Sequence, residues 1–201
     1  MNSSFYKLDK NKQQNIINAS ISVFANNSYK HALTDDIANR AGIAKGSLFN
    51  YFNNKQYLYL HMYRYCLKTF NADIKKMFSF NNPDFFDLVK QGMFITVKLY
   101  KKYPNLYKFI KRANEEQNPK LATEISMINI TNANNYVDNI YKNADYSKFK
   151  PKTDIGLLFR MMDWCGKGIT ESNYYKDYTL DEIYAESTKI LNYLKQATYQ
   201  L

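Results

Sequence analysis

The segment from Leu33 to Leu58 constrains the fold most, because it has the pattern of two short helices joined by a glycine turn. Thr34 has a side chain suited to a helix N-cap, and Asp35 and Asp36 place negative charge at the positive end of the helix dipole. We expect a helix of about two turns that begins at Thr34. Gly42 can adopt a positive φ, so the chain should turn there. The pattern predicts a helix-turn-helix.

A second short helix is expected from Lys45 to Phe52. Leu48 and Phe52 are four residues apart and would be buried on one face of it. The other face would present groups that can donate hydrogen bonds to phosphates and base edges: Lys45, Ser47, Asn50 and Tyr51. Since an α-helix fits the major groove of DNA, this pattern predicts a recognition helix. The apolar positions alone would equally fit any small helical hairpin with a glycine turn.

Longer motifs around the hairpin distinguish these interpretations. Residues 34–42 have the pattern T-x-x-I-A-x-x-A-G, and residues 46–58 have the pattern G-S-L-F-x-Y-F-x-x-K-x-x-L. From Gln14 to Leu58 the sequence resembles the N-terminal domain of the TetR family of bacterial transcriptional regulators. The resemblance implies a helix-turn-helix DNA-binding domain of three helices at residues 1–54. It also implies a helical effector-binding and dimerisation domain at residues 55–201.

Motif positions in this resemblance imply roles for individual side chains. The implied DNA-binding residues are Thr34, Lys45, Gly46, Ser47, Phe49, Asn50, Tyr51 and Lys55. Among them, phosphate contacts are expected from Thr34, Lys45, Tyr51 and Lys55, the last at a helix start whose backbone N–H groups also attract anions. Contacts to base edges are expected from Ser47, Phe49 and Asn50, because asparagine can pair with adenine and a phenyl ring can contact a thymine methyl group.

Three positions depart from the family's usual residues. Ser28 stands where glycine is usual, before Tyr29, so the loop lacks the conformational freedom of glycine. Ala44 stands where serine is frequent, so the recognition helix should lack a side-chain cap worth about 1 kcal/mol. Phe49 stands where tyrosine is common, so a hydroxyl contact is lost. We expect this loss to alter base preference.

The charge of the chain agrees with a nucleic-acid partner. The 201 residues carry a formal net charge of +10, and the pI is about 9.3. Residues 1–60 hold seven Lys/Arg and three Asp/Glu and the remainder 21 and 15, so positive charge is denser in the N-terminal part. A composition rich in Asn, Lys, Ile and Tyr, as expected of an AT-rich genome, accounts for part of this charge. Basic charge therefore supports DNA binding without proving it.

The sequence contains no pattern of a membrane span or a secretion signal. Its apolar runs are far shorter than the roughly 20 residues of a membrane helix, and its first residues contain no apolar signal core. Cys66 and Cys165 lie 99 positions apart within helical patterns, so reduced, buried thiols are expected. We expect a cytoplasmic protein.

The whole chain has the pattern of an all-α protein of about nine helices, with no reliable strand segment. A first helix is expected from Asp9 to Asn26, and a long one from Lys55 to Phe78 that would connect the two domains. The other helices are expected at residues 83–102, 104–112, 118–141, 153–174 and 180–199, each opening near a proline or a polar cap.

The last two expected helices carry apolar stripes. The residues of these stripes are Leu158, Met162, Cys165, Ile169, Ile183, Ile190, Leu191 and Leu194. The resemblance implies that these helices form a four-helix bundle with a second subunit, so a homodimer and a palindromic operator are expected. The alternative is that the stripes complete an intramolecular core. Gly166 and Gly168 indicate that another helix or a ligand approaches closely.

The second domain is rich in aromatic and methionine side chains, which suit an adaptable apolar pocket. The residues expected to bind a ligand are Tyr63, Phe70, Phe94, Phe109, Met127, Met161 and Trp164. We expect a cavity between the long helix from Lys55 and the helix that contains Trp164, although core packing would explain these side chains equally well. The predicted function is a repressor that an unidentified small apolar or aromatic effector releases from its operator.

Catalytic and metal-binding motifs are absent from the sequence. The two histidines, His31 and His61, have no metal-ligand spacing, and no C-x-x-C, G-x-S-x-G or glycine-rich phosphate loop occurs. We therefore expect no enzymatic activity, cofactor or metal. The alternatives are a DNA-binding or architectural protein of the same fold without a small ligand, an all-α binding or carrier protein, and an all-α enzyme.

Overall fold

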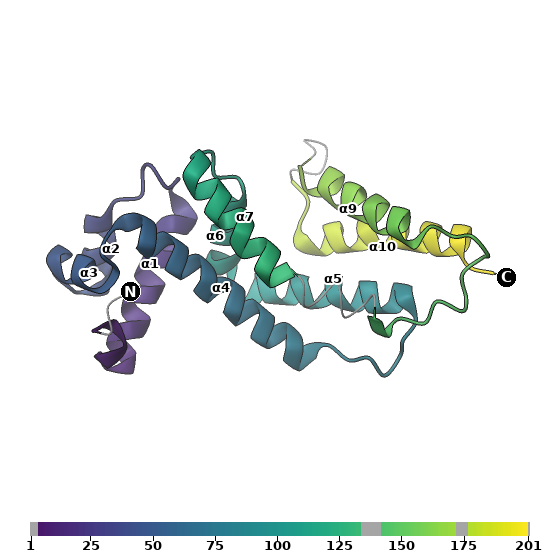
Figure 1. Ribbon diagram of the computed structural model, residues 1–201, viewed down its shortest axis with the longest axis horizontal. Coiled ribbons are helices and arrows are strands. Elements are labelled where there is room, and N and C mark those ends of the chain that lie inside the picture. The colour runs from purple at the N-terminus through teal and green to yellow at the C-terminus, as the bar shows by residue number, and fades with distance from the viewer. Residues whose placement is uncertain (1–3, 134–141, 172–176, 201) are drawn as a thin grey trace. The chain divides into compact units, whose positions relative to one another are not determined.

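The computed structural model describes residues 4–133, 142–171 and 177–200, and these residues form helices joined by loops, with no named strand among them (Figure 1). After a short 3-10 helix, η1 (Phe5–Lys7), the α-helices are α1 (Lys10–Asn26), α2 (Thr34–Ala41), α3 (Lys45–Phe52), α4 (Lys55–Met77), α5 (Phe85–Lys102), α6 (Pro104–Asn114), α7 (Pro119–Ala133), α9 (Ile155–Glu171) and α10 (Leu180–Thr198). The all-α prediction is confirmed. The ends predicted at residues 141 and 174 lie outside the described residues.

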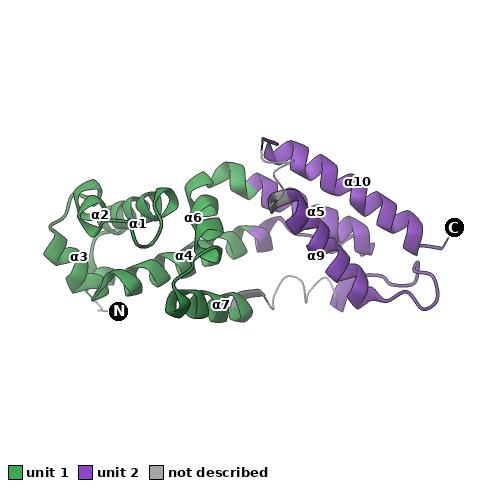
Figure 2. Ribbon diagram, turned by 90° about the horizontal axis from the view of Figure 1, so that it is seen from above, with its two compact units in different colours: residues 1–73, 99–134 green, residues 74–98, 135–201 purple. Residues whose placement is uncertain are grey.

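Contacts divide the chain into two compact units (Figure 2). Unit 1 contains residues 1–73 and 99–134, and unit 2 contains residues 74–98 and 135–201. The long helix α4 therefore begins in unit 1 and ends in unit 2. This division concerns packing. The functional division expected at residue 55 stays a prediction.

Local sequence explains where the helices of the predicted hairpin begin. The α2 helix begins at Thr34 as expected, but Leu33 occupies the N-cap position and no side chain caps the helix, so the predicted Thr34 cap is wrong. The α3 helix begins at Lys45, after Ala44, without a side-chain cap, as expected. Gly42 has a φ of 68° between the two helices, which confirms the predicted turn.

Polar caps define other helix starts as the sequence predicts. The Asp9 carboxylate accepts a hydrogen bond from the N–H group of Lys12 at 2.8 Å and so caps α1. At α10, Thr179 and Glu182 form a capping box in which each side chain accepts a hydrogen bond from the other residue's backbone N–H group.

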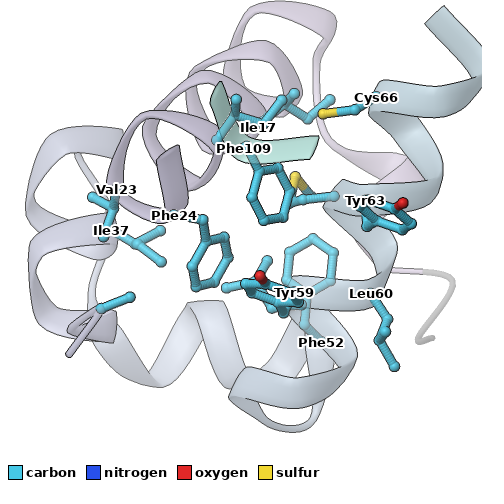
Figure 3. Packing of buried hydrophobic residues seen from close by; sticks show 14 of the residues in the cluster. Ile17, Val23, Phe24, Ile37, Phe52, Tyr59, Leu60, Tyr63, Cys66 and Phe109 are labelled. Atoms are coloured by element: carbon cyan, nitrogen blue, oxygen red, sulfur yellow. The ribbon is translucent and has the colours of Figure 1, made fainter. Parts of the chain in front are cut away.

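The core of unit 1 is formed by aromatic side chains from α1, α4 and α6 (Figure 3). The ring of Phe24 stacks on Phe109 at 5.5 Å between centroids and meets Tyr59 edge to face at 4.8 Å. All three side chains are fully buried. Each such burial contributes roughly 1.5–3 kcal/mol, so α1 is held firmly against α4 and α6.

The core of unit 2 lies around the first turn of α5. Phe85 is fully buried there, and the ring of Phe149 lies 5.4 Å from Phe85 and 4.8 Å from Tyr199. Leu158 of α9 and Leu191 of α10 are buried in the same cluster. These contacts pack α9, α10 and the residues before α9 and after α10 against the start of α5.

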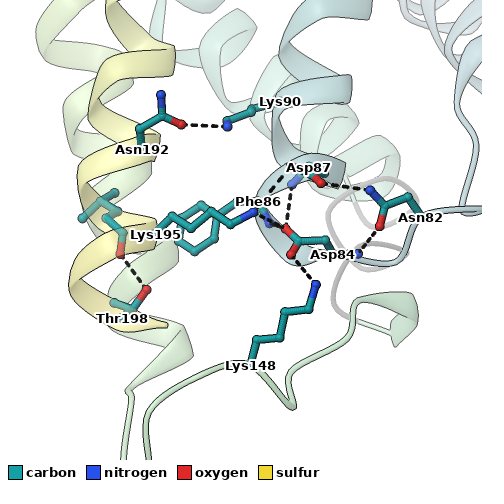
Figure 4. Close-up of polar contacts among 10 residues, drawn as sticks. Asn82, Asp84, Phe86, Asp87, Lys90, Lys148, Asn192, Lys195 and Thr198 are labelled. Atoms are coloured by element: carbon teal, nitrogen blue, oxygen red, sulfur yellow. Dashed lines mark hydrogen bonds and ion pairs between the residues drawn. The ribbon is translucent and has the colours of Figure 1, made fainter. Parts of the chain in front are cut away.

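A buried carboxylate joins three segments of unit 2 beside this core (Figure 4). Asp84 is 3% exposed, and its carboxylate accepts hydrogen bonds from Lys148 Nζ at 3.0 Å and Lys195 Nζ at 3.1 Å. It also accepts from the N–H groups of Phe86 and Asp87, where α5 begins. Burial alone would raise the pKa of Asp84, but the two lysines outweigh it and hold the pKa below its ordinary value.

Candidate nucleic-acid interface

The turn between α2 and α3 is closed by backbone hydrogen bonds. The Gly42 N–H group donates to the Asn39 carbonyl at 3.2 Å, and the Ile43 N–H group donates to the Ala38 carbonyl at 3.0 Å. This is the pattern in which a left-handed residue satisfies the last carbonyls of a helix. It sets the direction in which α3 leaves α2.

Burial of one face of α3 determines which of its residues face outward. Leu48 and Phe52 are buried, as the spacing predicts, and they pack in the core of unit 1. The predicted DNA-binding residues differ in exposure but none is fully buried: Lys45, Gly46 and Asn50 are exposed, and Thr34, Ser47, Phe49, Tyr51 and Lys55 are half-buried. The structure therefore leaves each α3 residue of the predicted set at least partly accessible to solvent.

Lys45 at the start of α3 has a partner that the sequence did not predict. Its Nζ atom lies 2.8 Å from Asp35 Oδ2 in the first turn of α2. Both side chains are about half exposed, at 50% and 56%. A phosphate that binds Lys45 would have to compete with this carboxylate.

Lys55 lies where α4 begins, as expected. Asn54 caps the helix, because its Oδ1 accepts a hydrogen bond from the Tyr57 N–H group at 3.0 Å. The Lys55 ammonium group lies 4.7 Å from the centre of the Tyr29 ring and donates to the Lys30 carbonyl at 3.3 Å. Burial lowers the pKa of Lys55, against an opposite effect of the Glu116 carboxylate. Its charge is thus held beside the loop that precedes α2.

Phe5 is a structural residue of this region that sequence reasoning missed. It is 2% exposed, and its ring lies 4.9 Å from Phe52 and 6.3 Å from Tyr51, both at the end of α3. No local pattern of the sequence indicates this burial, because the Phe5 ring contacts residues more than 40 positions away.

Comparison with known families identifies this arrangement. Residues 16–62 match the family model of the bacterial regulatory proteins of the tetR family. Residues 16–62 therefore form a helix-turn-helix domain of the TetR family. No curated protein sequence matches it.

Solved structures of bacterial regulators have the same fold over almost the whole chain. A TetR family transcriptional regulator from Chloroflexus aurantiacus J-10-FL has a TM-score of 0.69 at 18% identity, over 100% of this chain and 99% of that one. The fatty acid degradation regulator FadR from Bacillus halodurans has a TM-score of 0.69 at 20% identity, over 89% and 96%. FadR from Bacillus subtilis, in complex with stearoyl-CoA, has a TM-score of 0.64 at 21% identity, over 90% and 96%. At these identities the likeness concerns the fold.

The expected ligand-binding residues lie in different surroundings. Within unit 1, Tyr63, Phe70 and Phe109 are buried, whereas Met127 is exposed. The Tyr63 hydroxyl oxygen lies 2.9 Å from Asn114 Oδ1 and 2.6 Å from Asn129 Oδ1, so its polar end is already satisfied. Within unit 2 the remaining residues are exposed: Phe94, Met161 and Trp164. The structure brings together Tyr63 and Phe109, and the cavity expected between α4 and α9 stays a prediction.

The residues expected at the dimer interface face the inside of unit 2. Leu158 and Leu191 are buried in its core, and Leu194 packs against it, while Ile183 is half-buried. The others line an apolar pocket of about 230 Å³ between α5, α9 and α10; its lining is Val89, Met93, Met162, Cys165, Gly166, Ile169, Ser187, Ile190 and Leu191. These side chains therefore pack within one subunit in this structure.

A neighbouring stripe of α9, about 100° around the helix, reaches the surface. Leu157, Met161 and Trp164 are exposed at spacings of four and three residues, which places them on one stripe. A Cβ atom added at Gly166 or Gly168 would meet nothing within 4 Å. No other described part of the single chain therefore packs closely on these glycines, and the expected approach of a ligand or of a helix from a second subunit stays a prediction.

Two further observations concern functions that the sequence did not favour. Among the described residues, no group of three or more histidine, cysteine, aspartate or glutamate side chains is placed to hold a metal ion. In the same part of the chain, no helix has both the length and the apolar character that crossing a membrane requires.

Proposed function

We propose that this TetR-family chain is a sequence-specific DNA-binding transcriptional regulator that inserts α3 into the major groove. One observation carries this proposal. Asn50 is exposed on the side of α3 opposite Leu48 and Phe52, which fix the helix in the core, and Lys45 is exposed in its first turn. A helix held in this way can present side chains to DNA without losing its own packing.

Phosphate contacts would position α3 in the groove. Lys45 lies at the start of α3, and Lys55 lies at the start of α4, where backbone N–H groups without helical partners add to its charge. Such contacts set orientation and carry no sequence information. They would be made by Thr34, Lys45, Tyr51 and Lys55.

Base contacts would provide sequence preference. Asn50 is exposed near the middle of α3, and its amide can donate to and accept from adenine at the same time. Half-buried Phe49 offers an apolar ring edge to a thymine methyl group, and Ser47 offers a hydroxyl group. This set favours an operator with A·T pairs in each half-site.

We propose that two copies associate through α9 and α10 and so bind a palindromic operator. In this proposal the contact face of α9 is the exposed stripe of Leu157, Met161 and Trp164, because Leu158 and Leu191 are already buried within unit 2. Two-fold symmetry would place the recognition helices about 34–36 Å apart, which is one turn of DNA.

We further propose that a small apolar ligand releases the repressor from its operator. The pocket of about 230 Å³ in unit 2 is a candidate site, with Ser187 as the polar group in an otherwise apolar wall. It is smaller than the roughly 300–1,000 Å³ of typical ligand sites, so it would accept a small molecule or an end of a longer one. The binding of stearoyl-CoA by the Bacillus subtilis FadR is consistent with an apolar effector.

Selection of bound duplexes from random DNA tests the proposal directly. We expect a palindromic consensus whose half-sites are centred about one helical turn apart, and a loss of affinity when an apolar effector is added. Binding that shows no preferred sequence would contradict the proposed function. A consensus that no apolar compound affects would contradict the effector alone.

A further inference from the structure

The N-terminal segment of unit 1 is attached to the end of the recognition helix. In η1 the ring of Phe5 contacts Phe52 and Tyr51 of α3, at 4.9 and 6.3 Å between centroids, and His61 of α4 at 6.0 Å. Phe5 is almost completely buried in this aromatic cluster. The segment before α1 therefore has a defined position beside Tyr51, one of the expected phosphate contacts.

Hydrogen bonds hold the rest of the segment in place. The side-chain amide of Gln13 donates to the Leu8 carbonyl at 2.8 Å and to the Tyr6 carbonyl at 3.3 Å. The Leu8 N–H group donates to the Phe5 carbonyl at 3.2 Å, and Asp9 then caps α1. Buried Gln13 thus satisfies backbone groups of a short segment that could not hold its conformation alone.

The outward side of η1 has the chemistry of a phosphate-binding surface. Lys7 is exposed, and among the described residues its ammonium group has no ion pair. Tyr6 beside it is 59% exposed, and Lys10 and Lys12 follow on α1 with exposed side chains. The carboxylate of Asp9, the one acidic group between Phe5 and Lys12, accepts a hydrogen bond as the α1 cap. The positive charge of these lysines therefore exceeds the single negative charge between Phe5 and Lys12.

Lys7 lies within reach of the strand that Tyr51 would contact. Two residues of a 3-10 helix advance about 4 Å, and a lysine side chain extends several ångströms further. Phosphates on one strand of DNA follow each other at about 3.4 Å along the helix axis. A side chain that begins beside Phe5 can thus meet a phosphate neighbouring the one at Tyr51.

We propose that η1 is part of the DNA interface, in which Phe5 is a positioning residue and Lys7 contacts a backbone phosphate next to α3. The inference rests on the proposed function and extends its contact surface beyond the helix-turn-helix. Because the contact is to phosphate, it adds affinity for every sequence and does not change base preference.

The salt dependence of binding measures this contact. Lys7→Gln should remove two phosphate contacts per dimer, which lowers the slope of log affinity against log salt by about 1.8. Between 50 and 200 mM salt, the unaltered chain should then lose about 12-fold more affinity than the variant. The probes are the duplex recovered by selection and an unrelated duplex of equal length, and the slope change should be the same on both.

Lys68→Gln is the matched control. Lys68 is an exposed lysine of unit 1 on α4, seven residues and about 10 Å along the helix beyond His61, in the direction away from α3. The substitution makes the same change of charge in the same unit. Its slope should equal that of the unaltered chain, so a drop shared by both variants would mean a general charge effect and would overturn the inference.

Phe5→Ala tests the positioning role while Lys7 keeps its charge. The salt slope of Phe5→Ala should fall as far as that of Lys7→Gln. The slope of Phe5→Leu should stay close to that of the unaltered chain, because leucine keeps an apolar anchor. Circular dichroism establishes that each variant is folded. If Phe5→Ala does not fold, the comparison of Lys7→Gln with Lys68→Gln still tests whether Lys7 contacts a phosphate. A partial fall in the slope of Phe5→Leu then tests whether Phe5 positions Lys7.

Other outcomes separate the two proposals. An unchanged slope for Lys7→Gln, with the unaltered chain binding its selected duplex, overturns the Lys7 contact and leaves the proposed function standing. A loss confined to the selected duplex would assign Lys7 to base readout and would also overturn the phosphate contact. Failure of the unaltered chain to bind any duplex overturns the proposed function and this inference with it.

Discussion

Lys45 of the recognition helix forms an ion pair with Asp35 of α2, with 2.8 Å between Nζ and Oδ2. The pair spans the glycine turn, so it joins the two helices of the hairpin on the side expected to face DNA. Because both groups are about half exposed, the pair itself contributes only about 0.2–1 kcal/mol to folding. Its larger effect would be on DNA, since it holds a carboxylate next to a phosphate-binding ammonium group.

Asp35→Asn should therefore tighten binding to every duplex. Release of Lys45 and removal of one negative charge per subunit should increase affinity by about two- to fivefold at low salt, with a steeper salt dependence. Asp36→Asn is the control, because Asp36 is also exposed in the first turn of α2 but forms no ion pair among the described residues. Equal effects of the two variants in a binding titration would contradict a specific role for the pair.

Lys55→Ala should weaken binding to selected and unrelated duplexes by the same factor. The substitution removes one phosphate contact per subunit, so the salt slope of the dimer should fall by about 1.8. The ammonium group must also leave the Tyr29 ring to reach DNA, which offsets part of the affinity that the phosphate contact adds. Binding measured at several salt concentrations checks both statements, and a slope equal to that of Lys68→Ala would remove Lys55 from the interface.

Asn50→Ala should relax base preference at one position of each half-site. Loss of a bidentate contact to adenine costs about 1–3 kcal/mol of discrimination against the wrong base. Lys45→Ala is the contrasting variant, because loss of a phosphate contact should lower affinity without altering the selected consensus. Selection of bound duplexes from random DNA with both variants tests this prediction. If Asn50→Ala selects the same DNA consensus as the unaltered chain, Asn50 does not contribute to base readout.

The hairpin could be predicted from sequence because its determinants are local. The glycine at 42, the spacing of Leu48 and Phe52, and the missing cap at Ala44 each act within a few residues of the chain. Propensity, capping and apolar spacing all favour the same structure there. The same holds for the helix ends set by Asp9 and by prolines.

Contacts between distant residues could not be predicted in this way. The Phe5 side chain is buried by residues more than 40 positions away, and nothing in a polar N-terminal segment indicates such burial. The Lys45 ion pair depends on how two helices cross. Sequence pattern does not specify this geometry.

The orientation of α9 was ambiguous for a different reason. Apolar residues form two neighbouring stripes on this helix. One stripe contains Leu158 and Met162, and the other contains Leu157 and Met161. Periodicity finds both stripes but does not indicate which one packs inside the subunit. The position of the aromatic core around Phe85 decides it, because Leu158 packs against that core.

Acid should destabilise unit 2 through Asp84. Its pKa is lower in the folded chain than the ordinary value of 3.8, so its ion pairs stabilise the fold above about pH 4. As the pH falls through the lower folded pKa, the carboxylate is protonated and this contribution is lost. Asp84→Asn should cost about 2–3 kcal/mol near neutral pH, since it removes hydrogen bonds to charged groups, and should lose less stability than the unaltered chain below pH 4.

Denaturant unfolding at several pH values checks this prediction. Trp164, the single tryptophan, lies in unit 2 and provides a fluorescence probe of that unit. Asp177→Asn, at an exposed position of the same unit, serves as the control. An acid dependence that is the same with and without Asp84 would show that other carboxylates are responsible.

Trp164→Glu should dissociate the proposed dimer without unfolding the subunit. Trp164 is 59% exposed in the single chain, so the substitution leaves no cavity in unit 2, but it would place a charge within the α9 contact. Since it occurs in both subunits and central aromatic contacts are each worth about 2 kcal/mol, the dissociation constant should rise about a thousandfold. Sedimentation equilibrium measures this change.

Two further variants test which face of α9 makes the contact. Ile130→Glu, at a side chain that is 62% exposed on α7, should leave the dimer intact if the effect of Trp164→Glu is specific. Leu158→Ala should lower the free energy of unfolding of unit 2 by about 2–5 kcal/mol, because it leaves a cavity in that core, and should change the dissociation constant little. The opposite result would be that Leu158→Ala dissociates the dimer while Trp164→Glu stays dimeric. It would assign the interface to the stripe that faces inward in the single subunit, and α9 would then have to rotate on assembly.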